Sequence, residues 1–141
     1  MNEYFFSDIE VGMQETFQRE ITIEMENLFR YITGDENPLH KDDVYAKQCG
    51  EWYKKHVAFG MLTGSLYSTI VGMYLPGKYS LIHSFDELSF LKPVFAGDIL
   101  TVTGEVTSKE EFLKLICIKA VIRNQEYIIV SRARIKVLVT K

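Results

Sequence analysis

A carboxylate and an imidazole lie five residues apart in the segment Tyr31–Asp42, which reads YITGDENPLHKD. Asp35 and His40 flank an Asn-Pro pair, in which Pro38 removes a backbone donor and biases Asn37 away from helical angles. We therefore expect both side chains on one irregular loop, where they can converge on a water molecule. An ionised Asp exchanges a proton with that water, and a neutral His holds it or shares the acid/base work, as hydration or dehydration requires.

The simpler interpretation of the same residues is a turn, since Asp and Asn are common turn formers. The helix expected before it, over residues 22–32, has Thr22 as N-cap, Glu24 at the positive end of the dipole and Gly34 as its left-handed stop. Asp42 and Asp43 open a second short helix that runs to about residue 48. The apolar residues on one side of the first helix are Leu28, Phe29 and Ile32.

Four runs of residues follow one another in the chain: GDENPLHKD at 34–42, FGMLTGSL at 59–66, LPG at 75–77 and LSFLKPVFAGD at 88–98. In this order they resemble the MaoC-like, (R)-specific enoyl-CoA hydratases. The resemblance implies one hot-dog domain over residues 1–141, an α+β fold in which a curved antiparallel sheet wraps around a central helix. It also implies that Asp35 and His40 are the catalytic pair, adding water syn across a trans-2-enoyl thioester, with Asn37 orienting them.

Residues 59–75 favour a buried helix, because apolar residues occur on nearly every side of it. Gly60, Gly64, Ser65, Ser68 and Gly72 recur at steps of mostly three or four residues and form a stripe that a sheet or ligand can approach. The first amides of such a helix are unpaired and lie at the positive end of the dipole, where they would stabilise the developing enolate of a thioester.

The resemblance assigns that hydrogen bond to the Gly60 amide and places Ser65 at the site, although packing alone explains Ser65 equally well. The residues expected to line an acyl channel, with a purely structural role as the alternative, are Met61, Leu62, Leu66, Tyr67 and Ile70.

Two features depart from the family pattern. The family commonly has His directly before the Gly-Met pair, where this chain has Phe59. We expect activity to survive, because Asp35 and His40 are both present. The link from Cys49 to Val57 is about two residues longer than expected, and its WYKK run at 52–55 is suited either to a CoA nucleotide or acyl carrier protein, or to a solvated loop.

The rest of the chain is predicted to form strands, at 80–91, 99–106, 112–123 and 127–139, because β-branched and aromatic residues are frequent there. Polar connections are expected at 108–111 and 124–126, and an outer strand within residues 4–23. One helix followed by four strands indicates an α+β protein. Apolar residues on both faces of the strands predict a partner surface, and hence at least a homodimer.

Composition narrows the function classes. The 141 residues have a net charge of -3 and lack a basic region for nucleic acid. No apolar run is long enough for a membrane, and a cytoplasmic protein with free thiols at Cys49 and Cys117 is expected. His56 and His83 lack metal-ligand spacing, so neither a metal nor a resident cofactor is expected, only CoA or phosphopantetheine as the substrate's carrier.

The function expected from these observations is hydration of trans-2-enoyl thioesters to (R)-3-hydroxyacyl thioesters, or the reverse dehydration. One alternative is a hot-dog protein that binds acyl thioesters or serves as a scaffold without catalysis. A thioesterase is a weaker alternative, because many hot-dog thioesterases have an acidic residue on the central helix and residues 60–75 contain none.

Overall fold

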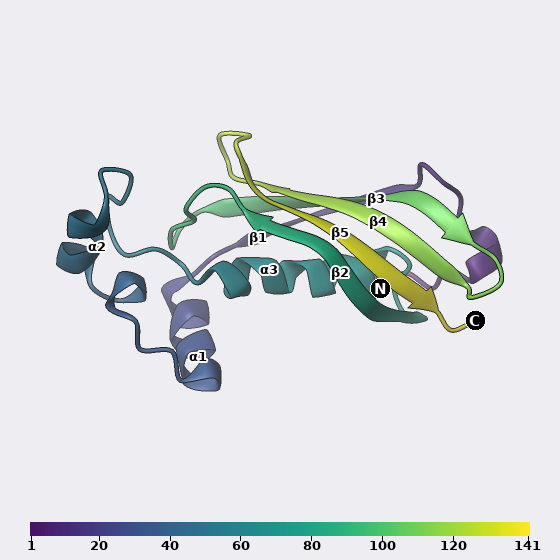
Figure 1. Cartoon of the computed structure of the whole chain (residues 1–141), viewed down its shortest axis with the longest axis horizontal. Coiled ribbons are helices and arrows are strands. Elements are labelled where there is room, and N and C mark those ends of the chain that lie inside the picture. Colours follow the sequence, from purple (N-terminus) through teal and green to yellow (C-terminus); the bar gives the residue numbers. More distant parts are fainter.

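The protein is built on a five-stranded antiparallel sheet with the strand order β1-β3-β4-β5-β2. The computed structural model describes the whole chain, residues 1–141. The sheet covers a central helix, α3 (Gly60–Thr69), which runs beneath it (Figure 1). The α+β class and the sheet-around-helix arrangement expected from the sequence are confirmed. The strands are β1 (Gln14–Glu20), β2 (Ser80–Phe90), β3 (Ile99–Glu110), β4 (Leu115–Arg123) and β5 (Ile129–Val139).

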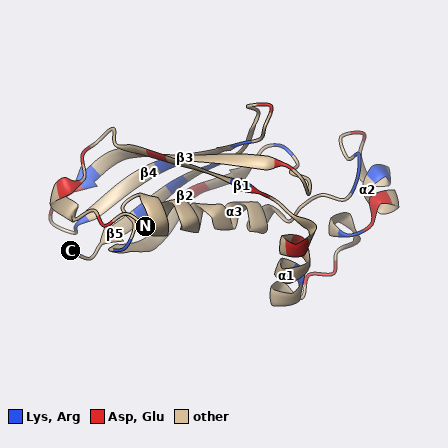
Figure 2. Ribbon diagram, turned by 180° about the vertical axis from the view of Figure 1, so that it is seen from behind, with Lys and Arg blue, Asp and Glu red and all other residues tan.

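Helix α3 is held in place by apolar contacts with the sheet. It contains no charged residue, so it is drawn in a single colour in Figure 2. A π-helical turn, Ile70–Tyr74, continues it, so the predicted helix over 59–75 is confirmed. The sheet residues that face it and are fully buried include Leu100, Val102, Ile116, Ile118, Ile122, Ile135 and Val137.

Residues 23–57, which we name the overhanging segment, project from the end of the sheet opposite the two termini (Figure 1). Its first element is α1 (Ile23–Thr33), where the Thr22 hydroxyl accepts a hydrogen bond from the Met25 amide at 3.2 Å. Gly34 ends that helix with a φ of 68°, a left-handed angle that glycine adopts without steric cost. The predicted N-cap and C-terminal stop are both confirmed.

The second helix of the overhanging segment, α2 (Asp43–Cys49), is also capped as predicted. One oxygen of the Asp42 carboxylate accepts hydrogen bonds from the amides of Val44 at 2.8 Å and Tyr45 at 3.0 Å. None of the helices in the structure is both long enough and apolar enough to span a bilayer. Both cysteines are free, as expected.

The predicted connection at 108–111 is wrong, because β3 extends through Glu110. The turn lies later because the Glu110 carboxylate accepts hydrogen bonds from the amides of Phe112 at 3.0 Å and Leu113 at 2.7 Å. Strand β4 therefore begins at Leu115, three residues later than predicted, and Phe112 is 91% exposed. Local side-chain capping outweighs the apolar character of Phe112 and Leu113 here.

The apolar side of α1 is only partly buried within this chain. Phe29 packs against the core, whereas Leu28 is 62% and Ile32 77% exposed. The helical spacing of these residues is correct, but Leu28 and Ile32 are not buried in the core of this chain, because the overhanging segment projects beyond the sheet.

Tyr67 on α3 connects the helix to the sheet through a chain of buried hydroxyls. Its phenol donates to the Ser131 hydroxyl at 2.9 Å, which donates to the Ser89 carbonyl at 2.8 Å. Burial raises the pKa of Tyr67 from 10.0 to about 12, and the hydrogen bond to Ser131 opposes this effect. The helix, β5 and β2 are therefore linked through one side chain.

We predict that Tyr67→Phe lowers the free energy of unfolding by about 1 kcal/mol, the typical net value of one hydrogen bond. Chemical denaturation measures this change. Tyr31→Phe is the matched control, since Tyr31 is 88% exposed and its substitution should leave stability unchanged. An equal effect of the two substitutions would contradict the importance of the buried chain.

The same variant has an expected pH dependence. Because the folded pKa of Tyr67 is raised, the unfolded chain loses the phenolic proton first as the pH rises above 10.0. The folded state then loses stability relative to the unfolded state until the folded pKa is reached. Between these pH values the wild-type protein should lose more unfolding free energy than Tyr67→Phe.

Candidate active site

Asp35 and His40 line one cavity of about 320 Å³ between the overhanging segment and the start of α3. Asp35 is exposed on the loop after α1, and His40 is half-buried at the end of a short 3-10 turn, Pro38–His40. The irregular loop predicted from the Asn-Pro pair therefore places both groups against the same space. The other residues lining this cavity are Phe29, Thr33, Phe59, Gly60, Met61 and Phe90.

The ring of His40 is oriented by a main-chain carbonyl. Nδ1 lies 2.8 Å from the Val57 carbonyl oxygen, which can only accept, so Nδ1 carries the hydrogen of this bond. In the neutral ring, Nε2 then presents a lone pair, and it has no partner within the protein. A free lone pair on Nε2 is needed for this nitrogen to accept a hydrogen bond, or a proton, from a water molecule.

Three further hydrogen bonds shape the loop. The Asn37 amide donates to the Asp35 carboxylate at 3.0 Å, and the Asn37 side-chain oxygen accepts from the Leu39 amide at 3.0 Å. Arg30 on α1 donates to the His40 carbonyl at 3.2 Å. Asn37 thus contacts Asp35 through its backbone, while its side chain caps the turn that carries His40.

Phe59 packs on the face of the His40 ring. The centroids of these two rings are 4.2 Å apart. The ring centroids of Phe29 and Phe59 are 5.3 Å apart, and Phe59 is 3% exposed. The residue that replaces the family histidine therefore makes an apolar contact and forms no hydrogen bond with either nitrogen of His40.

The first turn of α3, which lines the first cavity through Gly60 and Met61, has unpaired donors. The amides of Gly60, Met61 and Leu62 have no acceptor within the protein, as expected for the start of a helix. The Phe90 ring lies against this turn, since a Cβ at Gly60 would be 3.5 Å from it and one at Gly64 would be 3.3 Å away. The small-residue stripe thus serves the approach of an aromatic side chain from β2.

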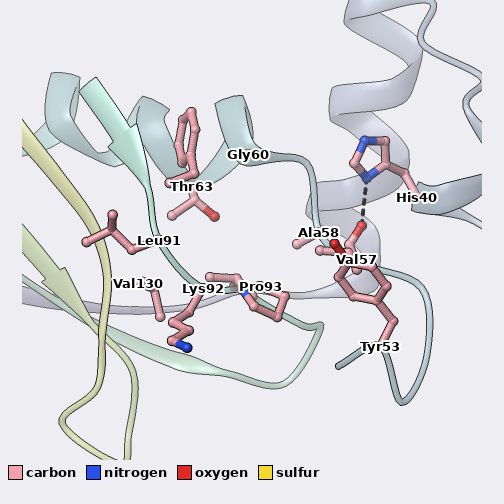
Figure 3. Close-up of a pocket in the computed structure, with 12 residues that line it drawn as sticks. His40, Tyr53, Val57, Ala58, Gly60, Thr63, Leu91, Lys92, Pro93 and Val130 are labelled. Atoms are coloured by element: carbon pink, nitrogen blue, oxygen red, sulfur yellow. Dashed lines mark hydrogen bonds between the residues drawn. The ribbon is translucent and has the colours of Figure 1, made fainter. Parts of the chain in front are cut away.

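A second cavity, of about 270 Å³, shares His40, Gly60 and Phe90 with the first. Figure 3 shows this second cavity, with His40 at one end of it. Lys92 and Tyr53 also line it. The Thr63 hydroxyl, on α3 at this cavity, is buried and has no partner within the protein. The remaining lining residues are Val57, Ala58, Leu91, Pro93, Val94 and Val130.

The structure separates the residues expected to line an acyl channel. Met61 lines the first cavity and is 56% exposed. Leu62, Leu66, Tyr67 and Ile70 are buried in the core and line neither cavity, and their role in binding an acyl chain stays a prediction. Ser65 is exposed, and its hydroxyl donates to the Leu62 carbonyl at 2.6 Å. Its role at the site stays a prediction.

Several lining residues were not recognised from the sequence. Val57 positions His40 through a backbone carbonyl, which no side-chain pattern reveals. Phe90 and Lys92 lie within the 88–98 run and Thr63 within the 59–66 run, so their membership of family-like runs was the available signal. No group of three or more His, Cys, Asp or Glu in the structure is arranged to hold a metal ion.

The charged residues near the loop form separate local pairs. Lys41 donates to Glu36, and this hydrogen bond lowers the pKa of the Glu36 carboxyl.

At the outer edge of the second cavity, the Lys92 ammonium lies 5.1 Å from the centroid of the Trp52 ring, and Trp52 is 75% exposed. Lys92 has no ion-pair partner in the structure.

Comparison of the sequence with known proteins identifies the family of this chain. Residues 7–127 match the MaoC like domain family. The chain belongs to this family of hydratases and dehydratases. It is 36% identical over 103 residues to an (R)-specific enoyl-CoA hydratase from Aeromonas caviae, a match covering 73% of this chain and 75% of that protein.

One further relative and one solved structure are similar to this chain. A 3-hydroxybutyryl-CoA dehydratase from Methylorubrum extorquens is 35% identical over 102 residues, a match covering 72% of this chain but only 63% of that protein. The unliganded R-hydratase PhaJ1 from Pseudomonas aeruginosa superimposes with a TM-score of 0.87 at 28% identity, covering 97% of this chain and 86% of that one. The MaoC-like protein described here therefore has the hot-dog fold and is related to (R)-specific enoyl-CoA hydratases.

We predict that neutral His40 is the tautomer with hydrogen on Nδ1, because the Val57 carbonyl can only accept. Long-range ¹H–¹⁵N correlation spectra, at a pH where the ring is neutral, distinguish the two nitrogens. His83 is the internal control, since it is exposed and its only partner, the Ser84 hydroxyl, can donate or accept. A hydrogen on Nε2 of neutral His40 would exclude the role of that nitrogen as acceptor of a hydrogen bond from the water.

Proposed function

We propose that this protein adds water to trans-2-enoyl thioesters to give (R)-3-hydroxyacyl thioesters, and that it catalyses the reverse dehydration when the product is consumed. The observation that carries this proposal is the convergence of three groups on one cavity. They are the Asp35 carboxylate, the ring of His40 with its free Nε2, and the unpaired amide of Gly60. The names of the curated relatives support the reaction class.

In the proposed mechanism the thioester carbonyl accepts a hydrogen bond from the Gly60 amide, so that negative charge developing on its oxygen is stabilised. His40 Nε2 and Asp35 hold the attacking water. Its oxygen bonds to C3, one of its protons passes to Asp35, and that proton is delivered to C2 on the same face. The sum is one water added across the double bond, with both residues returned to their starting states.

The composition of α3 argues against the alternative of a thioesterase. A hot-dog thioesterase with an acidic group on the central helix would need Asp or Glu between Gly60 and Tyr74, and there is none. A scaffold without catalysis would not require a free His40 Nε2 beside a carboxylate. The titratable side chains that line the first cavity are Asp35 and His40.

The carrier is proposed to be CoA or the phosphopantetheine arm of a carrier protein. Lys92 and Tyr53 line the second cavity, and Trp52 lies beside Lys92 at its edge. An ammonium without an ion-pair partner next to an exposed aromatic ring suits a phosphate-bearing arm that ends in a purine, because the ring can stack and the ammonium can pair with phosphate. These features favour CoA.

A homodimer is proposed from the free edge of the sheet. Strand β2 is hydrogen-bonded only to β5, and long exposed edges usually pair or are protected. Leu81 is 57%, Phe85 40% and Phe90 45% exposed on this strand. A second copy of the chain that covers β2 would bury these side chains and enclose the cavity that Phe90 lines.

We predict that Asp35→Asn and His40→Ala each lower kcat for crotonyl-CoA hydration by about 10²- to 10⁴-fold, the contribution of one general acid/base group. Loss of absorbance of the conjugated thioester measures the rate. Glu36→Gln is the matched control, because it removes one charge from the adjacent residue, which faces Lys41. The Glu36→Gln variant should retain kcat within about threefold, since Glu36 lines neither cavity and has no part in the proposed proton transfer.

Near-wild-type rates in Asp35→Asn would exclude the assigned mechanism. A wild-type protein inactive on crotonyl-CoA and also on a crotonyl carrier protein would exclude catalysis, and the acyl-thioester-binding alternative would then be preferred.

We also predict that Leu81→Lys shifts the protein from dimer to monomer, because the substitution places a charge on the edge of β2. Light scattering of the wild-type protein should give twice the chain mass of 16.3 kDa. The control is Val11→Lys, which should remain dimeric. Val11 is 62% exposed and precedes β1, the strand at the opposite edge of the sheet from β2. Monomeric wild-type protein would overturn the proposal.

A further inference from the structure

His56, which is not part of the proposed catalytic group, is held between two carboxylates from two different helices. Its Nδ1 lies 2.6 Å from an Asp43 oxygen on α2, and its Nε2 lies 3.1 Å from a Glu26 oxygen on α1. The His56 main-chain amide also donates to the same Asp43 oxygen at 2.9 Å. The three residues thus connect α1, α2 and the segment that enters α3. We name them the carboxylate clamp.

The Glu26 carboxylate depends on this contact. Glu26 is 1% exposed, its second oxygen has no partner within the protein, and no ion pair other than that with His56 reaches it. Burying a carboxylate without a partner is costly, so an unpaired buried polar group is rare. The chain nevertheless places Glu26 on the inward side of α1, which favours a specific role for this contact.

The clamp is adjacent in sequence to the residue that orients His40. The Val57 amide donates to the Leu39 carbonyl at 3.0 Å, and the Val57 carbonyl accepts from His40 Nδ1 at 2.8 Å. His56 therefore fixes the backbone of its neighbour, and Val57 in turn holds the turn and the imidazole of His40 by two hydrogen bonds. Arg30, one helical turn after Glu26, donates to the His40 carbonyl from α1.

Hydrogen-bond chemistry limits how the clamp can be assembled. A carboxylate accepts only, so both contacts of His56 exist together only if two protons lie between the three side chains. Either the imidazole is doubly protonated between two carboxylates, or a neutral imidazole accepts from a protonated Glu26. Hydrogen bonding from His56, through its amide first and its ring second, lowers the pKa of Asp43, so the Asp43 end is the ionised one.

We propose that Glu26, His56 and Asp43 are positioning residues for His40: by joining α1 and α2 to the backbone at residue 56, they fix Val57 and hence the direction of His40 Nε2. This inference rests on the proposed hydratase function for its kinetic consequence only. Its structural consequence, an ordered segment over residues 34–57, does not depend on any activity.

Two substitutions of Glu26 separate this role from simple stability. Glu26→Gln keeps the link, because its amide can donate to Nε2 of a neutral His56 whose Nδ1 donates to Asp43. Glu26→Leu removes the link but fills the same volume, and replacing a buried ionic group by an apolar one is often neutral for stability. Asp43→Ala tests the other end and should fold, since the Asp43 side chain is 54% exposed. Glu24→Ala, on an exposed residue in the same first turn of α1, is the control.

Hydrogen–deuterium exchange and crotonyl-CoA kinetics should be measured on all four variants. We expect amides of residues 34–57 to exchange about tenfold faster in Glu26→Leu and Asp43→Ala, with the amides of β3, β4 and β5 unchanged, as for a locally loosened segment. In the same two variants kcat should fall about 10- to 100-fold, the cost of misplacing a catalytic group by about 1 Å, with KM within about threefold. Glu26→Gln and Glu24→Ala should resemble the wild type in both measurements.

Unchanged exchange over residues 34–57 in Glu26→Leu and Asp43→Ala would overturn the proposal, as would equal kcat losses in Glu26→Gln and Glu26→Leu. If Glu26→Leu does not fold, the Asp43→Ala and Glu26→Gln pair decides by the same criteria. An inactive wild-type protein with the expected exchange pattern would reject the hydratase function while leaving the clamp established as the ordering contact.

Discussion

The contact on which the site depends is the hydrogen bond between His40 Nδ1 and the Val57 carbonyl, because it fixes both the direction and the tautomer of the imidazole. His40 lies on a segment that projects beyond the sheet, where the core residue Phe59 packs against its ring. Its position is also set by backbone groups at residue 57, directly before the buried start of α3. The Gly60 amide lies three residues after Val57, at the start of α3. The short stretch from Val57 to Gly60 therefore positions both His40 Nε2 and the amide donor.

The site also requires that α3 be uncharged and rich in small residues at its start. Glycine at positions 60 and 64 allows the Phe90 ring to lie in van der Waals contact with the helix, so a residue of β2 lines both cavities. A Cβ at position 64 would lie 3.3 Å from the ring and require a small shift, whereas one at position 60 would lie 3.5 Å away, in ordinary contact. The absence of acidic residues on α3 leaves Asp35 and His40, on the overhanging segment, to provide the acid/base chemistry that is proposed.

Much of this arrangement could be predicted from the sequence, and the failures have physical reasons. Thr22, Gly34 and Asp42 act locally, so the helix ends they define were predicted correctly. The end of β3 was misplaced because the Glu110 carboxylate caps a turn that composition assigns to a strand. The site was harder, since the apolar residues of α3 face either the core or the cavity, and spacing alone does not distinguish these directions. Val57 acts through its backbone carbonyl, which has no residue-type signal, and the imidazole of His56 contacts carboxylates that are distant in the sequence.

Phe59 is understood from the surfaces that it contacts. Its ring packs against the rings of Phe29 and His40 and the residue is 3% exposed, so apolar and aromatic contacts hold this side chain. A histidine at this position would need a partner for at least one nitrogen in order to be buried at low cost. The phenyl ring needs none, and it restrains the face of His40 while the Val57 carbonyl restrains its edge. Two contacts of different kind therefore determine one imidazole orientation, and a second titratable ring is not required to hold it.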